Sequence, residues 1–203
     1  MKRICTGILT VFSLATVAAF AQSTGTTTTT PVTGQTIQER KNNQQERIGN
    51  GVENGSLTAG EAANLEKKES NLNKEERDMR EDDNGKLTTA DKAKLTRQQN
   101  RLSSDIYKQK HDAQVQPKTN NEVNTRDRLQ QERIGQGIKS GQLTAGEAAN
   151  LEKKESKLNK EERTDRAANG GKLTPGEKKQ INHQQNGLSK QIYNKKHNAK
   201  KRG

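Results

Sequence analysis

The apolar residues of this chain fall on narrow stripes at helical spacing, separated by strongly polar positions. Leu65, Leu72 and Met79 recur every seven residues, and Leu95 and Leu102 repeat the same step. Such a period is typical of amphipathic α-helices, and stripes this narrow predict thin packing. We therefore expect an all-α protein. The pattern predicts helices near residues 36–50, 58–81, 88–110, 122–136, 144–167 and 174–197.

A short phrase, Gly-x-Leu-Thr-x-x-acid, occurs four times and predicts four of these helix starts. Its glycine allows a tight turn, its threonine accepts a hydrogen bond from the first helical turn, and its acid three residues later completes a capping box. The expected N-caps are Thr58, Thr88, Thr144 and Thr174.

The chain also repeats itself at an offset of 86 residues. Between residues 45–114 and 131–200, 43 of 70 positions are identical, and the segment 59–70 returns as 145–156 without a change. Self-similarity of this kind indicates a tandem duplication. We predict two tandem helical units of about 80 residues, each a lead helix followed by two turn–helix modules. The predicted limits are 36–114 for unit 1, 115–121 for a hinge, 122–200 for unit 2 and 201–203 for a basic tail.

Residues 1–21 have the pattern of a secretory signal peptide. Lys2 and Arg3 precede an apolar stretch that ends in Ala19-Phe20-Ala21, a small-x-small cleavage site. We therefore expect a periplasmic or secreted protein, with a Thr-rich flexible leader at 22–35. The one cysteine, Cys5, leaves with the signal peptide. Disulfides, thiolate metal ligands and thiol nucleophiles are then not expected.

Charge is distributed unequally between the two units. Residues 45–114 carry 13 Lys and Arg against 14 Asp and Glu, whereas residues 131–200 carry 15 against 8. The basic second unit suits an anionic component of the cell envelope, or an acidic or unfolded protein. The alternative is a solvated helix surface without a partner. Aromatic residues make up only 2% of the chain, so specific nucleic-acid binding is not expected.

Candidate catalytic chemistry is sparse. The acidic residues alternate with Lys and Arg at helical spacing, which predicts solvated ion pairs and not paired catalytic acids. The pairs Tyr107/His111 and Tyr193/His197 recur at i, i+4 near helix ends, where a histidine interacts favourably with the helix dipole. No nucleophile–base pattern, phosphate-binding glycine loop or zinc-ligand spacing is found. We expect neither enzymatic activity nor a cofactor, apart from the weak calcium binding considered next.

The repeated phrase resembles an EF-hand loop, with a glycine, an apolar residue two positions later and an acid six positions later. The stretch 80–91 keeps most of that pattern in Asp82, Asn84 and Asp91. The resemblance implies paired helix–loop–helix modules, with Leu57 and Leu87 meeting across the turns, and weak calcium binding at these three residues. All four loops depart from the pattern at the first ligand position, which is Asn or Gln in two copies and Arg in the others. A plain capped turn is the alternative.

Two further resemblances concern secreted helical proteins. The stretch 173–180, Leu-Thr-Pro-Gly-Glu-Lys-Lys-Gln, is similar to the Leu-Thr-x-x-Gln signature of Spy/CpxP-type periplasmic chaperones, with Glu in place of Gln. The run Gly-x-Leu-Thr…Ile-Tyr-x-x-Lys-His is similar to a group of secreted bacterial proteins from which no activity transfers. The expected function is a non-enzymatic exported helical repeat protein that acts by surface binding or in a structural or stress role in the cell envelope. Alternatives are a chaperone and a degenerate calcium-binding module.

Overall fold

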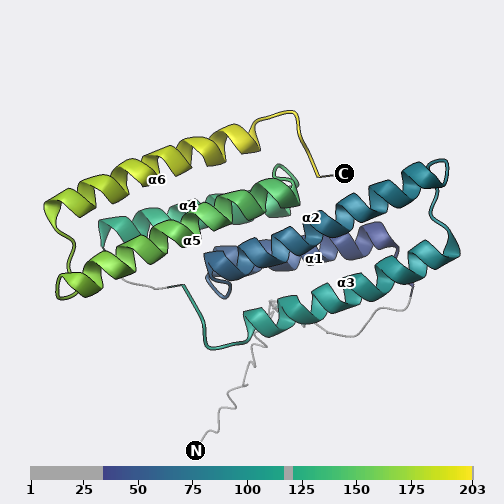
Figure 1. Ribbon diagram of the computed structural model, residues 1–203, viewed down its shortest axis with the longest axis horizontal. Coiled ribbons are helices and arrows are strands. Elements are labelled where there is room, and N and C mark those ends of the chain that lie inside the picture. Colours follow the sequence, from purple (N-terminus) through teal and green to yellow (C-terminus); the bar gives the residue numbers. More distant parts are fainter. Residues whose placement is uncertain (1–33, 117–120, 203) are drawn as a thin grey trace, which may run out of the picture. The chain divides into compact units, whose positions relative to one another are not determined.

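The computed structural model describes residues 34–116 and 121–202, which lie in one compact unit, and these residues form helices and no strands. The predicted all-α fold is confirmed (Figure 1). The predicted signal peptide and almost all of the leader lie outside the described residues. The helices are α1 (Ile37–Asn54), α2 (Ala59–Asp82), α3 (Thr89–Lys110), α4 (Glu122–Lys139), α5 (Ala145–Ala168) and α6 (Pro175–Lys196).

Local capping decides where the helices begin. All four threonines of the repeated phrase are N-caps with complete capping boxes, as predicted. At α2, for example, Glu61 Oε2 accepts the Thr58 N–H at 2.8 Å. Thr36 and Glu39 make a fifth box at α1 that lacks the rest of the phrase, and Asn121 caps α4 without a box.

The lead helices run further than the sequence predicts. α1 continues to Asn54 instead of residue 50, and α4 continues to Lys139 instead of residue 136. The interior glycines at 49, 51, 135 and 137 have low helix propensity, yet both helices continue through them. The α1 helix ends where Gly55 adopts a φ of 75°, a left-handed conformation that glycine adopts without strain.

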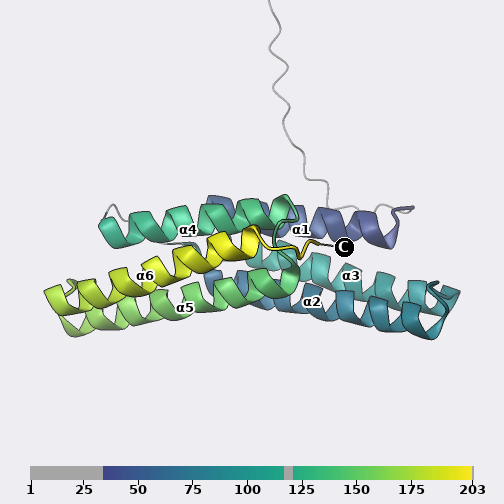
Figure 2. The ribbon, with the colours of Figure 1, turned by 90° about the horizontal axis from the view of Figure 1, so that it is seen from above.

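The helices are arranged in two groups of three that pack face to face. α3 contacts α1 and α2, while α6 contacts α4 and α5. The two groups meet through α1 against α4 and α2 against α5. Figure 1 shows α2 and α5 running in opposite directions over their N-terminal halves, and Figure 2 shows α1 and α4 together in a second layer. The arrangement relates the two groups by an approximate twofold rotation.

Both groups contribute to one hydrophobic core. Its members from the first group are Ile48, Val52, Leu57, Ala62, Leu65, Leu102 and Ile106. The members from the second group are Ile134, Ile138, Leu143, Ala148, Leu151, Leu188 and Ile192. Neither set alone is large, because the chain is only 26% hydrophobic. A shared core allows each half to bury apolar surface that it could not bury against its own helices.

Buried glutamines attach the outer helices to the lead helices. The Gln44 side chain is 1% exposed, and its Nε2 donates to the Gln99 carbonyl of α3 at 2.6 Å. Gln130 makes the equivalent bond to the Gln185 carbonyl of α6 at 2.7 Å. Each bond gives a buried glutamine amide a hydrogen-bond partner. Because that partner is one particular backbone carbonyl, the bond also sets the register of the outer helix.

The crossing of α1 and α4 is a contact between backbones at Gly49 and Gly135. A Cβ atom on Gly49 would lie 2.9 Å from the Gly135 carbonyl oxygen, and one on Gly135 would lie 2.8 Å from the Gly49 carbonyl oxygen. Real Cβ atoms do not approach backbone that closely. Glycine at both positions therefore sets the spacing of the two lead helices.

The predicted contact between Leu57 and Leu87 is wrong. The 24 residues of α2 separate the two turns, a distance of about 36 Å at 1.5 Å per residue. Instead, Leu57 folds back onto its own lead helix, where its N–H donates to the Gly51 carbonyl at 3.0 Å and its side chain contacts Gly51. The turns within a unit are therefore not paired.

Replacement of Gly49 by alanine tests the crossing. We expect Gly49→Ala to lower the free energy of unfolding by about 2 kcal/mol, because the added methyl group forces α1 and α4 apart. Gly187→Ala is the matched control, since Gly187 lies in α6 with open space around it. The control should stabilise the protein by about 0.5–1 kcal/mol through helix propensity. Urea unfolding measures both, and equal effects would contradict the proposed crossing.

Candidate functional site

Four glutamates lie buried where α2 packs against α5. Glu66, Glu69, Glu152 and Glu155 are all 0–1% exposed. The prediction that the acidic residues form solvated ion pairs is wrong for these four. Their helices approach closely because the facing positions are small: Gly60 lies against Ser156, and the equivalent glycine lies against Ser70.

The partners of these carboxyl groups are few. Gln45 Nε2 donates to both carboxyl oxygens of Glu66, at 3.1 and 3.0 Å. Gln131 Nε2 donates to one oxygen of Glu152 at 2.9 Å. Neither oxygen of Glu155 has a hydrogen-bond partner within the described residues. A buried carboxylate without partners is costly, so protonation is favoured.

Burial raises the pKa of each of the four carboxyl groups. The pKa rises to about 7 for Glu69 and to about 8 for Glu152. The pKa values of Glu66 and Glu155 are raised well above their ordinary value, first by desolvation and then by the neighbouring carboxyl groups. These side chains therefore act near neutral pH largely as neutral acids, which removes much of the repulsion between them.

In the first half of the protein, two cations compensate this acidity. Lys41 is buried and lies 3.5 Å from Glu76, and its charge lowers the pKa of Glu69. Arg202, in the segment after α6, donates its Nη1–H to the Ile138 carbonyl at 2.9 Å. The Arg202 charge lowers the pKa of both Glu66 and Glu69.

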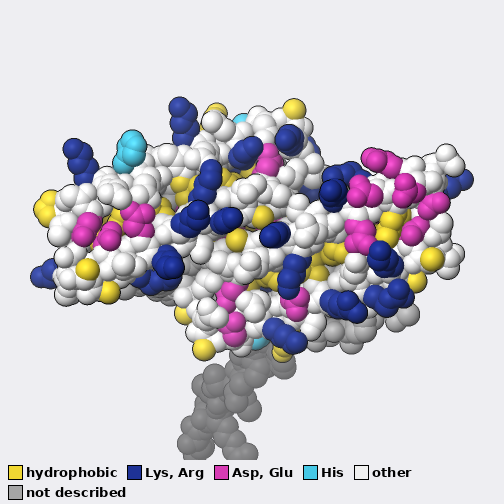
Figure 3. All heavy atoms as spheres, in the orientation of Figure 1, with side chains coloured by type: hydrophobic (Ala, Val, Ile, Leu, Met, Phe, Trp, Pro, Cys, Tyr) yellow, Lys and Arg dark blue, Asp and Glu magenta, His cyan; other side chains and the backbone are white. Residues whose placement is uncertain are grey.

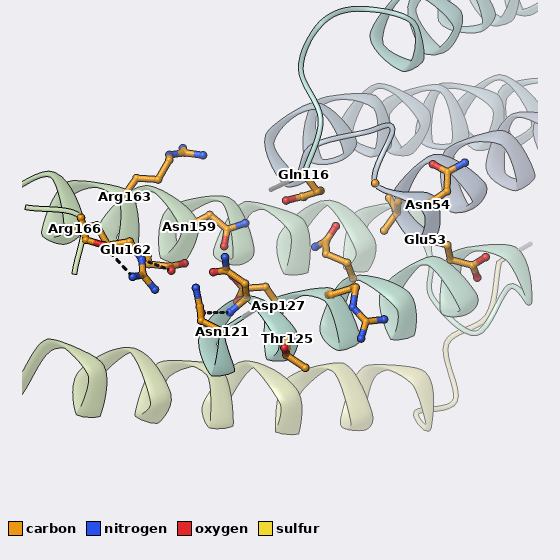
Figure 4. A pocket seen from close by; sticks show the side chains of 16 residues that line it. Glu53, Asn54, Gln116, Asn121, Thr125, Asp127, Asn159, Glu162, Arg163 and Arg166 are labelled. Atoms are coloured by element: carbon orange, nitrogen blue, oxygen red, sulfur yellow. Dashed lines mark hydrogen bonds and ion pairs between the residues drawn. The ribbon is translucent and has the colours of Figure 1, made fainter. Parts of the chain in front are cut away.

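The second half has an open groove of about 690 Å³ in the equivalent place. α4 and α5 form its walls, and the end of α1 and Gln116 close one end (Figure 4). We call it the α4–α5 groove. Its lining residues are Val52, Glu53, Asn54, Gly55, Gln116, Asn121, Asn124, Thr125, Asp127, Arg128, Gln131, Asn159, Glu162, Arg163, Arg166 and Gly171.

The groove is rich in hydrogen-bond acceptors. Gln131 Oε1 and Asn159 Oδ1 are buried and have no donor within the described residues. Desolvation raises the pKa of Asp127 to about 7, and the charge of the nearby Glu162 adds to this effect. The hydrogen bond from Gln185 Nε2 to the Asp127 carboxyl group acts in the opposite direction. Glu162 accepts a hydrogen bond from Arg166 Nε at 2.7 Å. A strongly shifted carboxyl in a groove is the pattern expected of a functional site.

The predicted calcium ligands lie at the turn between α2 and α3. Asp82 is the last residue of α2, Asn84 has a φ of 53°, and Asp91 caps α3 by accepting the Thr88 N–H at 3.0 Å. Asp83, which the sequence reasoning missed, lies between them. Partial desolvation, then Asp91 and Asp82, raise its pKa. Among the residues with described positions, no group of three or more His, Cys, Asp or Glu could hold a metal ion. Calcium binding stays a prediction.

The surface of α6 is strongly basic. Lys179, Lys190 and Lys195 are exposed there, and Lys200 and Lys201 follow in the C-terminal segment. The equivalent residues 86 positions earlier are Ala93, Ser104, Gln109, Gln114 and Val115. On the face of the molecule in Figure 3, Lys and Arg side chains are prominent over the middle, whereas many acidic side chains gather toward the two ends.

None of the described helices combines the length and apolar character needed to cross a membrane. No family model, curated protein or solved structure matches this chain. The functional conclusion therefore depends on the charges and contacts of the described residues.

The buried carboxyl groups predict that stability falls as pH rises. Between about pH 4.5 and 8 the native state binds protons more tightly than the unfolded chain, so raising the pH favours unfolding. We expect the free energy of unfolding to fall by several kcal/mol from pH 5 to pH 8, because one pKa unit corresponds to about 1.4 kcal/mol and a carboxyl group with a pKa of about 7 alone contributes about 2.5 kcal/mol. Urea unfolding at both pH values measures the difference.

Two single variants identify the groups responsible. Glu155→Gln resembles the protonated acid and should raise stability at pH 8 while leaving it nearly unchanged at pH 5. Glu69→Gln is the matched control in the other half, and its effect should be smaller because Lys41 and Arg202 already favour the charged form. Stability of the wild-type protein that increased from pH 5 to pH 8 would rule out this account.

The calcium prediction is tested by calorimetric titration. If calcium binds at the α2–α3 turn, titration of the wild-type protein with millimolar calcium gives a heat of binding. This heat should be lost in Asp82→Ala. Asp91→Ala is less informative, because it also removes the cap of α3. Absence of heat from the wild-type protein would end this prediction.

Proposed function

We propose that this protein is an exported, non-enzymatic binding protein whose basic α6 surface attaches to an anionic component of the cell envelope. The observation that carries this proposal is the difference between α3 and α6. The two helices occupy equivalent places in the fold and both carry exposed basic residues, but residues 175–202 contain eight Lys and Arg against one acid, whereas residues 89–116 contain six against three. An acidic protein is the alternative partner of the same surface.

The lysines are available for an external partner. Lys179 and Lys190 make no ion pair within the described part of the chain, whereas Lys195 lies 3.5 Å from Glu147 and Lys178 lies 2.8 Å from Glu122. Positive charges held on a rigid helix attract a polyanion over the Debye length of about 8 Å at physiological salt. Each lysine close to an anionic membrane surface contributes about 1 kcal/mol to binding.

Two of the three histidines, His111 and His197, contribute to helix ends. His111 and His197 stack on Tyr107 and Tyr193, with ring centroids 4.2 and 4.1 Å apart. The Nδ1 atom of each histidine lies 2.7 Å from the carbonyl of its tyrosine. Both rings are thus engaged in ending a helix, and neither is paired with a nucleophile.

A chaperone role has less support. That role predicts an exposed apolar concavity, but the exposed large hydrophobic side chains of the described residues are distributed over several elements. They are Tyr107, Val115, Leu129 and Tyr193. Suppression of aggregation of an unfolded client, followed by light scattering, would favour this second function.

Binding to vesicles that contain an anionic phospholipid tests the main proposal. We expect the triple variant Lys179→Ala, Lys190→Ser, Lys195→Gln, which installs the α3 residues, to weaken binding by ten- to a hundredfold at low salt. The wild-type interaction should also weaken as salt is raised. Co-sedimentation with the vesicles measures both effects, and lipopolysaccharide micelles and an acidic protein provide parallel arms.

Neutralisation of α3 provides the control. The matched variant Lys92→Ala, Lys108→Ala, Arg101→Ala removes the same number of charges from the other outer helix. It should leave binding within about twofold of the wild type. Equal losses in the two variants would show a response to net charge alone and would contradict a surface on α6.

A further inference from the structure

The approximate twofold relation places two equivalent grooves in the protein. The first lies between α1 and α2 and is bounded by the α4–α5 turn. The second is the α4–α5 groove, bounded by the α1–α2 turn. Each is closed by the segment that follows an outer helix: the Arg202 N–H donates to the Gly141 carbonyl at 3.1 Å, and the Gln116 N–H donates to the Gly55 carbonyl at 3.0 Å. Arg202 and Gln116 therefore occupy equivalent positions.

Two cations fill the first groove. The Arg202 side chain lies over Gly141, with its guanidinium carbon 3.8 Å from where a Cβ would be. Lys41 enters from α1 and is 6% exposed. These are the two charges that lower the pKa of Glu69.

The α4–α5 groove has lost both cations. Arg202 is replaced there by Gln116, and Lys41 is replaced by Asp127. The acid that corresponds to Glu69 is Glu155, whose two oxygens have no donor within the described residues. The replacement of two positive side chains by an amide and an acid leaves the groove open and leaves Glu155 without the two cations that lower the pKa of Glu69, although Arg128 and Arg163 still line the groove.

The wall of the groove presents acceptors to an incoming group. Gln131 is 4% exposed, its Nε2 is committed to Glu152, and its Oε1 has no donor. Figure 4 shows Asn159 and Asp127 on facing helices with their side chains directed toward one another. A guanidinium or ammonium group carries several N–H donors and a positive charge, and it would satisfy these acceptors together.

Arginines also line this groove, but they do not exclude a cation. Arg166 is paired with Glu162, as Arg80 is paired with Glu76 in the first groove. Arg163 corresponds to Arg77. Arg128 corresponds to Asn42, so the groove is lined by one arginine that the first half lacks.

We propose that the α4–α5 groove binds an organic cation, with a guanidinium or ammonium group placed where Arg202 and Lys41 lie in the other half. The volume of about 690 Å³ lies in the range of small-molecule sites and leaves ample room for agmatine. The cation comes either from a free metabolite-sized compound or from an arginine side chain on a peptide. This site lies apart from the α6 lysines, so it stands or falls independently of the envelope-binding function.

Thermal unfolding with agmatine as the probe tests the proposal. We expect a saturating concentration to raise the Tm of the wild-type protein by about 5 °C, since a ligand that binds only the native state stabilises it. Acetyl-arginine amide in place of agmatine represents the peptide source. Acetyl-citrulline amide, the uncharged counterpart of acetyl-arginine amide, should have no effect, and an equal response to it would overturn the proposal.

Gln116→Arg is the decisive variant, because it supplies the cation that the other half already has. It should raise the Tm without ligand and remove the response to agmatine. Asp127→Asn should weaken the response at least tenfold without filling the groove. The control Asn71→Lys adds one positive charge at an exposed position, where the other half has Lys157, and should leave the response unchanged.

The experiment must distinguish the added ligand from a lysine of the chain itself as the cation in the groove. Lys118 lies outside the described residues and is close in sequence to Gln116, so Lys118→Gln is measured in parallel. It should respond to agmatine as the wild type does. A response that appeared only in Lys118→Gln, or one that persisted in both Gln116→Arg and Asp127→Asn, would overturn the assignment of the groove to an external cation.

Discussion

The fold depends on the close antiparallel contact between two copies of the same three-helix unit. Each unit contains too few large apolar side chains to bury a core of its own, so the halves share one. That contact is possible because Gly49 and Gly135 let the lead helices touch through their backbones. It also buries four glutamates, which a looser contact would have left in water.

These buried acids make the interface polar and selective. Carboxyl groups and glutamines accept and donate along fixed directions, unlike aliphatic side chains, so one register of α1 on α2, and of α4 on α5, is favoured over its neighbours. The same groups create a demand for positive charge. The first half meets this demand with Lys41 and Arg202, while the second half, where Asp127 and Gln116 stand, does not. Substitutions between the two repeated segments thus coincide with an open groove in the second half and with the buried Lys41 in the first.

A signal of the buried interface was present in the sequence. The segment 59–70 is identical in both units, although other surface-like stretches have diverged, and it contains Glu66 and Glu69. Two copies that pack on each other constrain both surfaces at once, so a change on either side must fit the other. Periodicity alone could not identify this face, because Glu66 and Glu69 are charged residues and are counted as exposed by any hydrophobic pattern.

The helical class, the internal repeat and the helix starts could be predicted from the sequence alone, because a capping box involves residues only three apart and needs no distant partner. It also located the Asp82, Asn84 and Asp91 turn, whose calcium binding remains a prediction, but not Asp83 beside it. Three other features could not be predicted and are seen only in the folded protein: α1 continues through its glycines, Leu57 turns inward away from Leu87, and Glu155 is buried. Each of these depends on residues brought together from distant parts of the chain, where the burial of one side chain is set by the backbone of another.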